Sequence, residues 1–174
     1  MGADPRILKY YSRKDVQAEI VSIAKNREVA VKFGESGYGK RPDIIQYESD
    51  IKELAQEGAT SFHISEEHWH DPLKLKTGMT RKDLDELRSG WDLILDIDCK
   101  FIEFSKITAQ LLIEALQFHQ INNIGLKFSG NRGFHLAIPY ASFPSTVNAK
   151  KTQLLFPEGP RMIAEYLSEL IKDQ

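Results

Sequence analysis

The stretch Asp92-Leu93-Ile94-Leu95-Asp96-Ile97-Asp98 decides the fold, because acidic and apolar residues alternate along it. Successive side chains of a strand point to opposite faces, so the three aspartates and Ile94 share one face and the other apolar residues share the second. The apolar face must pack against a core. The sequence therefore predicts a central strand at 91–98 whose acidic face looks into a cleft or onto a cation.

The carboxylates of Asp96 and Asp98 indicate a metal site at the C-terminal end of this strand. Two acids held two residues apart repel each other unless positive charge lies between them. Oxygen ligands favour Mg²⁺ or Mn²⁺. Asp92 lies about 13 Å from Asp96 by strand rise, too far to share one ion, and is interpreted as structural. The alternative is an edge strand with solvated acids.

A second informative stretch follows a helical segment: Ser129-Gly130-Asn131-Arg132-Gly133-Phe134-His135. It has the composition of a plain hairpin turn, which is one interpretation. In the other, the glycines let backbone amides approach phosphate oxygens and Arg132 clamps them with its planar guanidinium. His135 shares a strand face with Ala137 and would donate to a phosphate in the same cleft.

Hydrophobic periodicity places further elements around these two motifs. Together they predict an α+β fold with a mixed β-sheet and flanking helices around a β-α-β-β unit. Helices are expected over 13–25, 49–57, 80–88, 105–119 and 157–172, and strands over 28–33, 43–47, 59–65, 91–98, 123–128 and 134–139.

Composition indicates an ordinary globular protein with one domain over residues 1–174. Hydrophobic residues make up 41% and charged residues 28% of the 174 residues, and the net charge is −2. No apolar run is long enough to cross a membrane, and the N-terminus lacks a secretory signal. The single cysteine, Cys99, excludes an internal disulfide and a multi-cysteine zinc site. We therefore expect an intracellular protein, cytoplasmic and associated with the nucleoid, or nuclear.

Two other segments could carry chemistry but are interpreted as surface. His68 and His70 with Glu66 could bind a transition metal, and His63 lies nearby, but no further ligand completes the set. The loop Gly34 to Arg41 is rich in glycine but lacks the phosphate-binding P-loop pattern. Scattered lysines and arginines indicate solvated surface, with salt-sensitive nucleic-acid binding as the alternative.

Asp96-Ile97-Asp98 and the stretch 129–135 resemble the two signature motifs of the archaeo-eukaryotic primase superfamily, specifically the small catalytic subunit of DNA primase. The resemblance implies a primase-type nucleotidyltransferase that extends or synthesises a primer on a DNA template. It implies that Asp96 and Asp98 hold catalytic Mg²⁺ or Mn²⁺. It assigns nucleotide binding to the second motif, at Ser129, Gly130, Arg132, Gly133 and His135. The implied partners are a nucleoside triphosphate, a DNA template and a large primase subunit, with no membrane.

The chain departs from that family in two respects. The family has a third metal-binding aspartate on a strand after the second motif, and no aspartate-bearing strand is expected here after Pro139. A cysteine-rich zinc knuckle is also absent. These departures leave open a non-catalytic nucleotide- or nucleic-acid-binding paralogue with a decayed metal site. A metal-dependent nuclease is a third alternative, although hydrolysis has no need of a triphosphate cradle.

Overall fold

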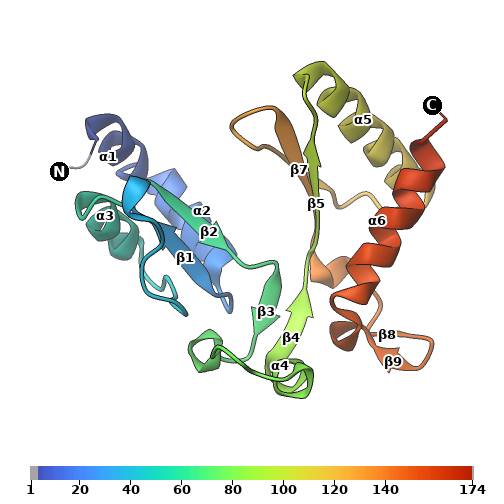
Figure 1. Ribbon diagram of the computed structural model, residues 1–174, viewed down its shortest axis with the longest axis horizontal. Coiled ribbons are helices and arrows are strands. Elements are labelled where there is room, and N and C mark those ends of the chain that lie inside the picture. The colour runs from blue at the N-terminus through green and yellow to red at the C-terminus, as the bar shows by residue number, and fades with distance from the viewer. Residues whose placement is uncertain (1–3, 174) are drawn as a thin grey trace. The chain divides into compact units, whose positions relative to one another are not determined.

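The computed structural model describes residues 4–173 and divides into two compact units, with the boundary between Ser89 and Gly90 (Figure 1). Each unit has its own hydrophobic core. The α+β class is confirmed, and the single catalytic domain over 1–174 stays a prediction. No helix within residues 4–173 is both long and apolar enough to span a membrane.

The first unit packs helices against a two-stranded antiparallel sheet in which Val29 pairs with Ile64. Its core is built from buried aliphatic residues such as Val29, Val31 and Ile51. Its elements are α1 (Pro5–Tyr11), α2 (Lys14–Ala24), β1 (Val29–Lys32), η1 (Gly34–Ser36), α3 (Glu48–Gln56), β2 (Ser61–Ile64), β3 (Glu67–Trp69), η2 (Pro72–Lys74), α4 (Arg81–Leu87) and the start of β4 (Arg88–Trp91).

Most of the elements expected in this unit are confirmed. Thr80 caps α4 and accepts from the amide of Asp83, whose carboxylate bonds back to the Thr80 amide. Helix α1 was not expected. It begins with Asp4 as the cap and Pro5 at its first position, which is a recognised start signal on a helix of only seven residues. The segment after Ser65, which periodicity did not resolve, contains β3, η2 and the start of β4.

The predicted strand at 43–47 is wrong. Ile45 is buried, as a strand residue would be, but the backbone amides around it find other partners. The amides of Gln46 and Tyr47 both donate to the Asp50 carboxylate, at 3.0 and 2.9 Å. The backbone amides just before α3 are therefore already hydrogen-bonded and cannot pair with a neighbouring strand.

The second unit contains the predicted β-α-β-β arrangement. Its three-stranded sheet has the order β5-β7-β6, and both pairings are antiparallel, so this sheet is antiparallel where a mixed sheet was expected. Helix α5 begins at Ile102, earlier than the expected Ser105. The elements are β5 (Leu93–Asp98), α5 (Ile102–Phe118), β6 (Gly125–Phe128), β7 (Gly133–Ile138), η3 (Tyr140–Ser142), β8 (Thr146–Val147), β9 (Lys150–Lys151), η4 (Thr152–Leu155) and α6 (Glu158–Ile171).

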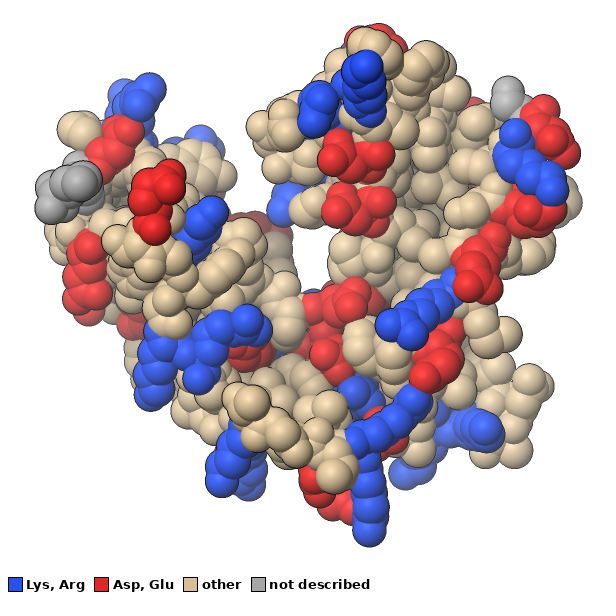
Figure 2. All heavy atoms as spheres, in the orientation of Figure 1, with Lys and Arg blue, Asp and Glu red and all other residues tan. Residues whose placement is uncertain are grey.

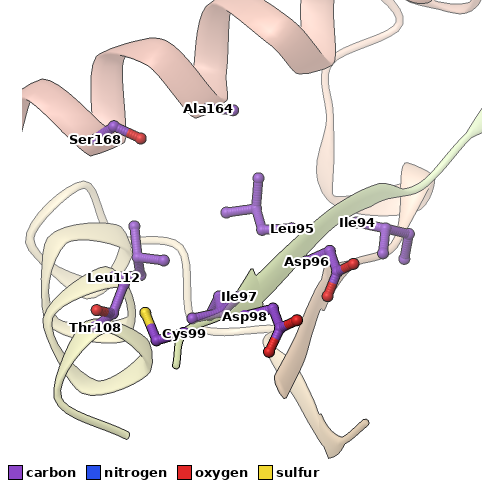
Figure 3. Close-up of a pocket in the computed structure, with 10 residues that line it drawn as sticks. All are labelled: Ile94, Leu95, Asp96, Ile97, Asp98, Cys99, Thr108, Leu112, Ala164 and Ser168. Atoms are coloured by element: carbon purple, nitrogen blue, oxygen red, sulfur yellow. The ribbon is translucent and has the colours of Figure 1, made fainter. Parts of the chain in front are cut away.

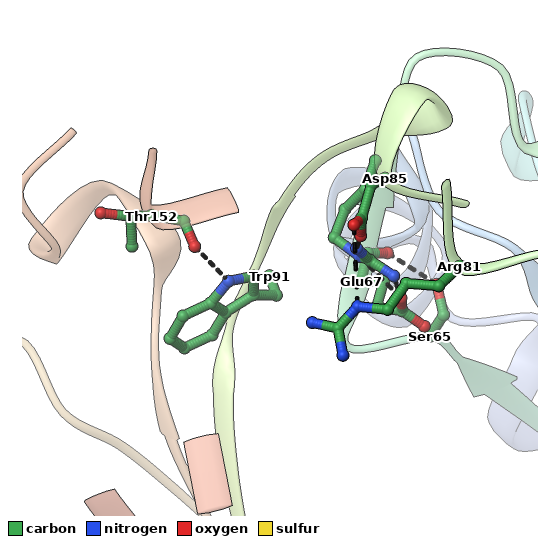
Figure 4. A network of polar contacts seen from close by, with 7 residues as sticks. Ser65, Glu67, Arg81, Asp85, Trp91 and Thr152 are labelled. Atoms are coloured by element: carbon green, nitrogen blue, oxygen red, sulfur yellow. Dashed lines mark hydrogen bonds and ion pairs between the residues drawn. The ribbon is translucent and has the colours of Figure 1, made fainter. Parts of the chain in front are cut away.

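Helices α5 and α6 lie on the same side of the β5–β7 pair and cover its apolar face (Figure 1). Leu93, Leu136 and Leu167 are almost fully buried there. The Trp91 indole joins this core, and its Nε1 donates to the Thr152 carbonyl at 2.9 Å (Figure 4). The buried Asp92 accepts from the Tyr140 amide at 2.9 Å, consistent with a structural role. Packing on one face leaves the other face of the sheet to the polar side chains of the site.

Candidate active site

The centre of the site is a row of three side chains across the sheet. Asp96 of β5 pairs with His135 of β7, and His135 pairs in turn with Lys127 of β6. Directly paired residues point to the same face, so the three side chains lie side by side. His135 Nε2 is 3.5 Å from Asp96 Oδ1. Lys127 was not predicted as a site residue, because only the strand register shows that it lies beside His135.

Asp96 and Asp98 lie on one side of β5, and Leu95 points to the other side, as expected from the alternation (Figure 3). Both carboxylates are exposed, with 72% of the Asp96 side chain accessible. They are among the residues that line a groove of about 370 Å³ along β5. Thr108 and Leu112 of α5 and Ala164 and Ser168 of α6 line its other wall. Strand β5 lies at one edge of the sheet, so the predicted central position is wrong. The acidic pair is therefore open to solvent and to a ligand.

A close backbone contact, which the sequence did not reveal, explains why residue 133 is a glycine. It pairs with Asp98, and a Cβ built on it would lie 2.2 Å from the Ile97 carbonyl oxygen. That distance is far inside van der Waals contact, so only glycine lets β7 approach β5 this closely. The close approach places the turn 129–133 directly beside the Asp98 end of the acidic strand.

We expect Gly133→Ala to destabilise the second unit by about 1–3 kcal/mol, because the backbone of β7 must move away from β5. Urea unfolding followed by circular dichroism measures this change. Gly125→Ala is the matched control. A Cβ on Gly125, in β6 of the same sheet, would lie 3.8 Å from Ala137, which is ordinary contact, so this variant should stay within about 0.5 kcal/mol of wild type. A Gly133→Ala protein as stable as wild type would contradict the close approach.

The turn itself is closed by Ser129. Its amide donates to the Gly133 carbonyl at 2.9 Å, and its Oγ accepts from the Gly133 amide at 3.2 Å. The hydroxyl hydrogen is not used in these two bonds and can be donated to a ligand. Gly130, with its positive φ, forms the corner of the turn. The hairpin-turn and phosphate-cradle interpretations are thus compatible.

A second tether joins the turn to the start of α5. The buried Ser105 hydroxyl donates to the Arg132 carbonyl at 2.6 Å. Arg132 Nη1 lies 3.5 Å from the Lys100 carbonyl oxygen, at the limit of a hydrogen bond. Ser105 positions Arg132 without touching the site, and no pattern in the sequence separates it from an ordinary helix serine.

The acidic pair fits a hard divalent cation without further protein ligands. Mg²⁺ is commonly held by one or two carboxylates, with water and substrate phosphates completing its coordination. Among the residues the structure describes, no group of three or more His, Cys, Asp or Glu side chains could hold a metal ion. The residues around His68 and His70 therefore do not form such a group either. His63 instead makes a 2.9 Å hydrogen bond to Ser61 and packs edge-to-face on Tyr38.

The described residues on the face drawn in Figure 2 form no single basic footprint. Lysines and arginines are interspersed with acids over the face drawn in Figure 2. In the loop after β1, Arg41 makes two hydrogen bonds to Glu28, at 2.7 and 3.0 Å. In the segment 74–82, Lys74 lies 3.7 Å from Asp71 and Lys82 lies 3.9 Å from Glu86. Much of the positive charge in both regions is offset by local acids.

Comparison with known proteins supports the fold. No family model matches the chain. A solved structure, the polymerase domain of Mycobacterium tuberculosis ligase D in complex with DNA, superimposes with a TM-score of 0.62. The match covers 95% of this chain and 63% of that chain at 14% sequence identity. The chain therefore has a primase/polymerase-like fold.

One relative is similar in sequence. The uncharacterized protein MJECS07 of Methanocaldococcus jannaschii is 26% identical over 136 residues, which is 78% of this chain. The chain spans only 29% of the length of that relative. The similarity therefore extends over most of this chain and concerns a part of a larger protein.

Proposed function

We propose that the chain is a primase-type nucleotidyltransferase domain that binds a nucleoside triphosphate and adds nucleotides to a primer on a DNA template. One observation carries this proposal: the acidic strand and the turn 129–133 are direct neighbours on one open sheet face. Asp96 pairs with His135 and Asp98 pairs with Gly133. Carboxylates for a cation and donors for phosphates thus meet within one site on a polymerase-like fold.

The residues divide between holding the cation and holding the triphosphate. Asp96 and Asp98 would hold Mg²⁺ or Mn²⁺, which supplies activation of the attacking 3′-hydroxyl and neutralises charge on the leaving pyrophosphate. Arg132 would bind phosphate oxygens with its guanidinium, and His135 and the Ser129 hydroxyl would donate to them. Gly130 leaves the backbone of the turn open to the same oxygens, while Gly133 holds the turn beside β5.

We propose that residues outside this site also contact the DNA template. The basic loops 37–41 and 74–82 are candidates, but the ion pairs described above leave them with little net positive charge. A large primase subunit could supply additional DNA affinity, in keeping with the net charge of −2.

Calorimetric titration of a nucleoside triphosphate, with and without Mn²⁺, tests the site, and primer extension on a DNA template tests the activity. Metal-dependent binding together with incorporation is the expected result. Metal-dependent binding without incorporation would favour the second candidate, a non-catalytic nucleotide-binding module. The two-carboxylate site, which lacks a third acidic ligand among residues 4–173, is the observation behind that candidate. Absence of triphosphate binding both with and without Mn²⁺ would contradict both candidates.

Lys127 should contribute to triphosphate affinity, because its position beside His135 places an ammonium group at the edge of the phosphate site. We expect Lys127→Ala to weaken triphosphate binding about tenfold, the effect of losing one charged hydrogen bond. The same calorimetric titration measures it. Lys172→Ala is the matched control, since Lys172 is an exposed lysine that pairs with Glu169 at the end of α6. Equal triphosphate affinities for the two variants would show that Lys127 does not contribute to the site.

A further inference from the structure

We propose that Phe101 and Phe104 form a stacking platform for the bases of a single-stranded nucleic acid, with Lys100 holding an adjacent phosphate. This inference deepens the proposed function and rests on it only for the identity of the strand as template or primer. The platform is defined as Phe101 and Phe104. Neither sequence motif includes these residues.

Both rings of the platform are exposed to solvent. Phe101 is 57% and Phe104 58% exposed, at the N-terminal end of α5. Their centroids are 5.9 Å apart and their planes are inclined at 77°, an edge-to-face pair. In such a pair the ring that presents its edge keeps both of its faces uncovered by its partner. A nucleobase stacks on a free aromatic face, and each stacked base adds substantially to affinity.

Positive charge lies directly beside the platform. Lys100 Nζ lies over the ring of Phe101, 5.5 Å from its centroid, and the Lys100 carbonyl lies next to the Arg132 guanidinium. The neighbouring Glu103 is paired with Lys106 at 3.0 Å, so its charge is locally offset. Aromatic rings interleaved with cations suit a strand of stacked bases and phosphates. A surface for protein docking has a core depleted of charge, which this patch does not have.

The platform is fixed to the triphosphate-binding turn. The Ser105 hydroxyl, one residue after Phe104, donates to the Arg132 carbonyl, so the start of α5 and the turn hold each other in place. Asp98 lies only three residues before Phe101 in the chain. A base stacked on the platform would therefore be close to the acidic pair, where an incoming nucleotide must meet a strand.

The test measures oligonucleotide binding without metal or triphosphate. Fluorescence anisotropy of a labelled oligothymidylate at low salt gives the affinity of the full chain. The double variant Phe101→Ala/Phe104→Ala should bind about tenfold more weakly. Phe101→Tyr/Phe104→Tyr, which keeps both rings, should bind as wild type does. Phe118→Ala is the matched control, because Phe118 is 80% exposed at the other end of the same helix.

Each outcome decides the proposal. An unchanged affinity in the double alanine variant overturns it, as does an equal loss in Phe118→Ala or no binding by wild type. Unchanged affinity together with altered self-association in sedimentation would identify a protein-docking surface instead. If the platform binds the oligonucleotide but the chain does not bind triphosphate, the proposed function fails and the platform stands.

Discussion

Replacing Asp96 by asparagine is expected to weaken Mn²⁺-dependent triphosphate binding by more than about 100-fold and to abolish nucleotide incorporation. Loss of a group that only orients a metal ligand already costs roughly 10–100-fold, so loss of a ligand itself should cost more. Asparagine keeps the shape of the side chain and removes the charge that holds the cation. Asp98→Asn should have the same effect, because the two carboxylates lie on one side of β5 (Figure 3). Calorimetry measures the binding and primer extension the activity.

Stability should be almost unaffected by this substitution, since the Asp96 side chain is 72% exposed. Glu114→Gln is the matched control, because it removes one exposed negative charge from α5 of the same unit. Triphosphate binding by Asp96→Asn at wild-type strength would exclude the acidic pair as the metal site. It would leave the resemblance of the two motifs without a chemical role.

Replacing Arg88 by alanine is expected to destabilise the first unit by about 3–5 kcal/mol, the usual effect of removing one partner from a buried ion pair. Arg88 has a side chain only 4% exposed, and its guanidinium binds both Glu67, at 2.8 Å, and Asp85. Both acids, Glu67 and Asp85, belong to the polar network drawn in Figure 4. Removal of Arg88 takes this counter-ion from Glu67 and leaves Asp85 with its 3.7 Å contact to Arg81. Urea unfolding monitored by circular dichroism measures the loss.

The variant should also respond to pH in a defined direction. Burial raises the pKa of Glu67 and the bonds from Arg88 oppose that shift, so removing Arg88 raises the pKa further. An acid with a raised pKa in the folded state contributes stability at low pH, and this contribution is lost as the pH rises through that pKa. The destabilisation of Arg88→Ala should therefore be larger at pH 7 than at pH 5.

Arg81→Ala is the control for this prediction. Arg81 lies 3.7 Å from the same Asp85, but its side chain is 53% exposed. A surface ion pair contributes about 0–1 kcal/mol, so this variant should remain close to wild type. Equal losses for the two arginines, or no loss for Arg88→Ala, would show that the buried network does not support the first unit.

Local patterns predicted the parts of the fold that depend on neighbouring residues. Alternation along 92–98 predicted a strand with its aspartates on one face, and glycine with asparagine predicted the turn at 129–133. Helical periodicity predicted α5 and α6 because each has one apolar face that must be buried. The strand predicted at 43–47 is wrong because the Asp50 carboxylate, in the first turn of α3, accepts from the amides of Gln46 and Tyr47.

The sequence by itself therefore determined the α+β class, the β-α-β-β unit and the two motifs. Only the tertiary structure decided the strand register, which sets Lys127 beside His135, and the contact that makes Gly133 necessary. It also decided the division into two units and the tether from Ser105 to the turn. The physical reason is that side-chain periodicity is a local property of the chain, whereas pairing and packing depend on residues far apart in sequence.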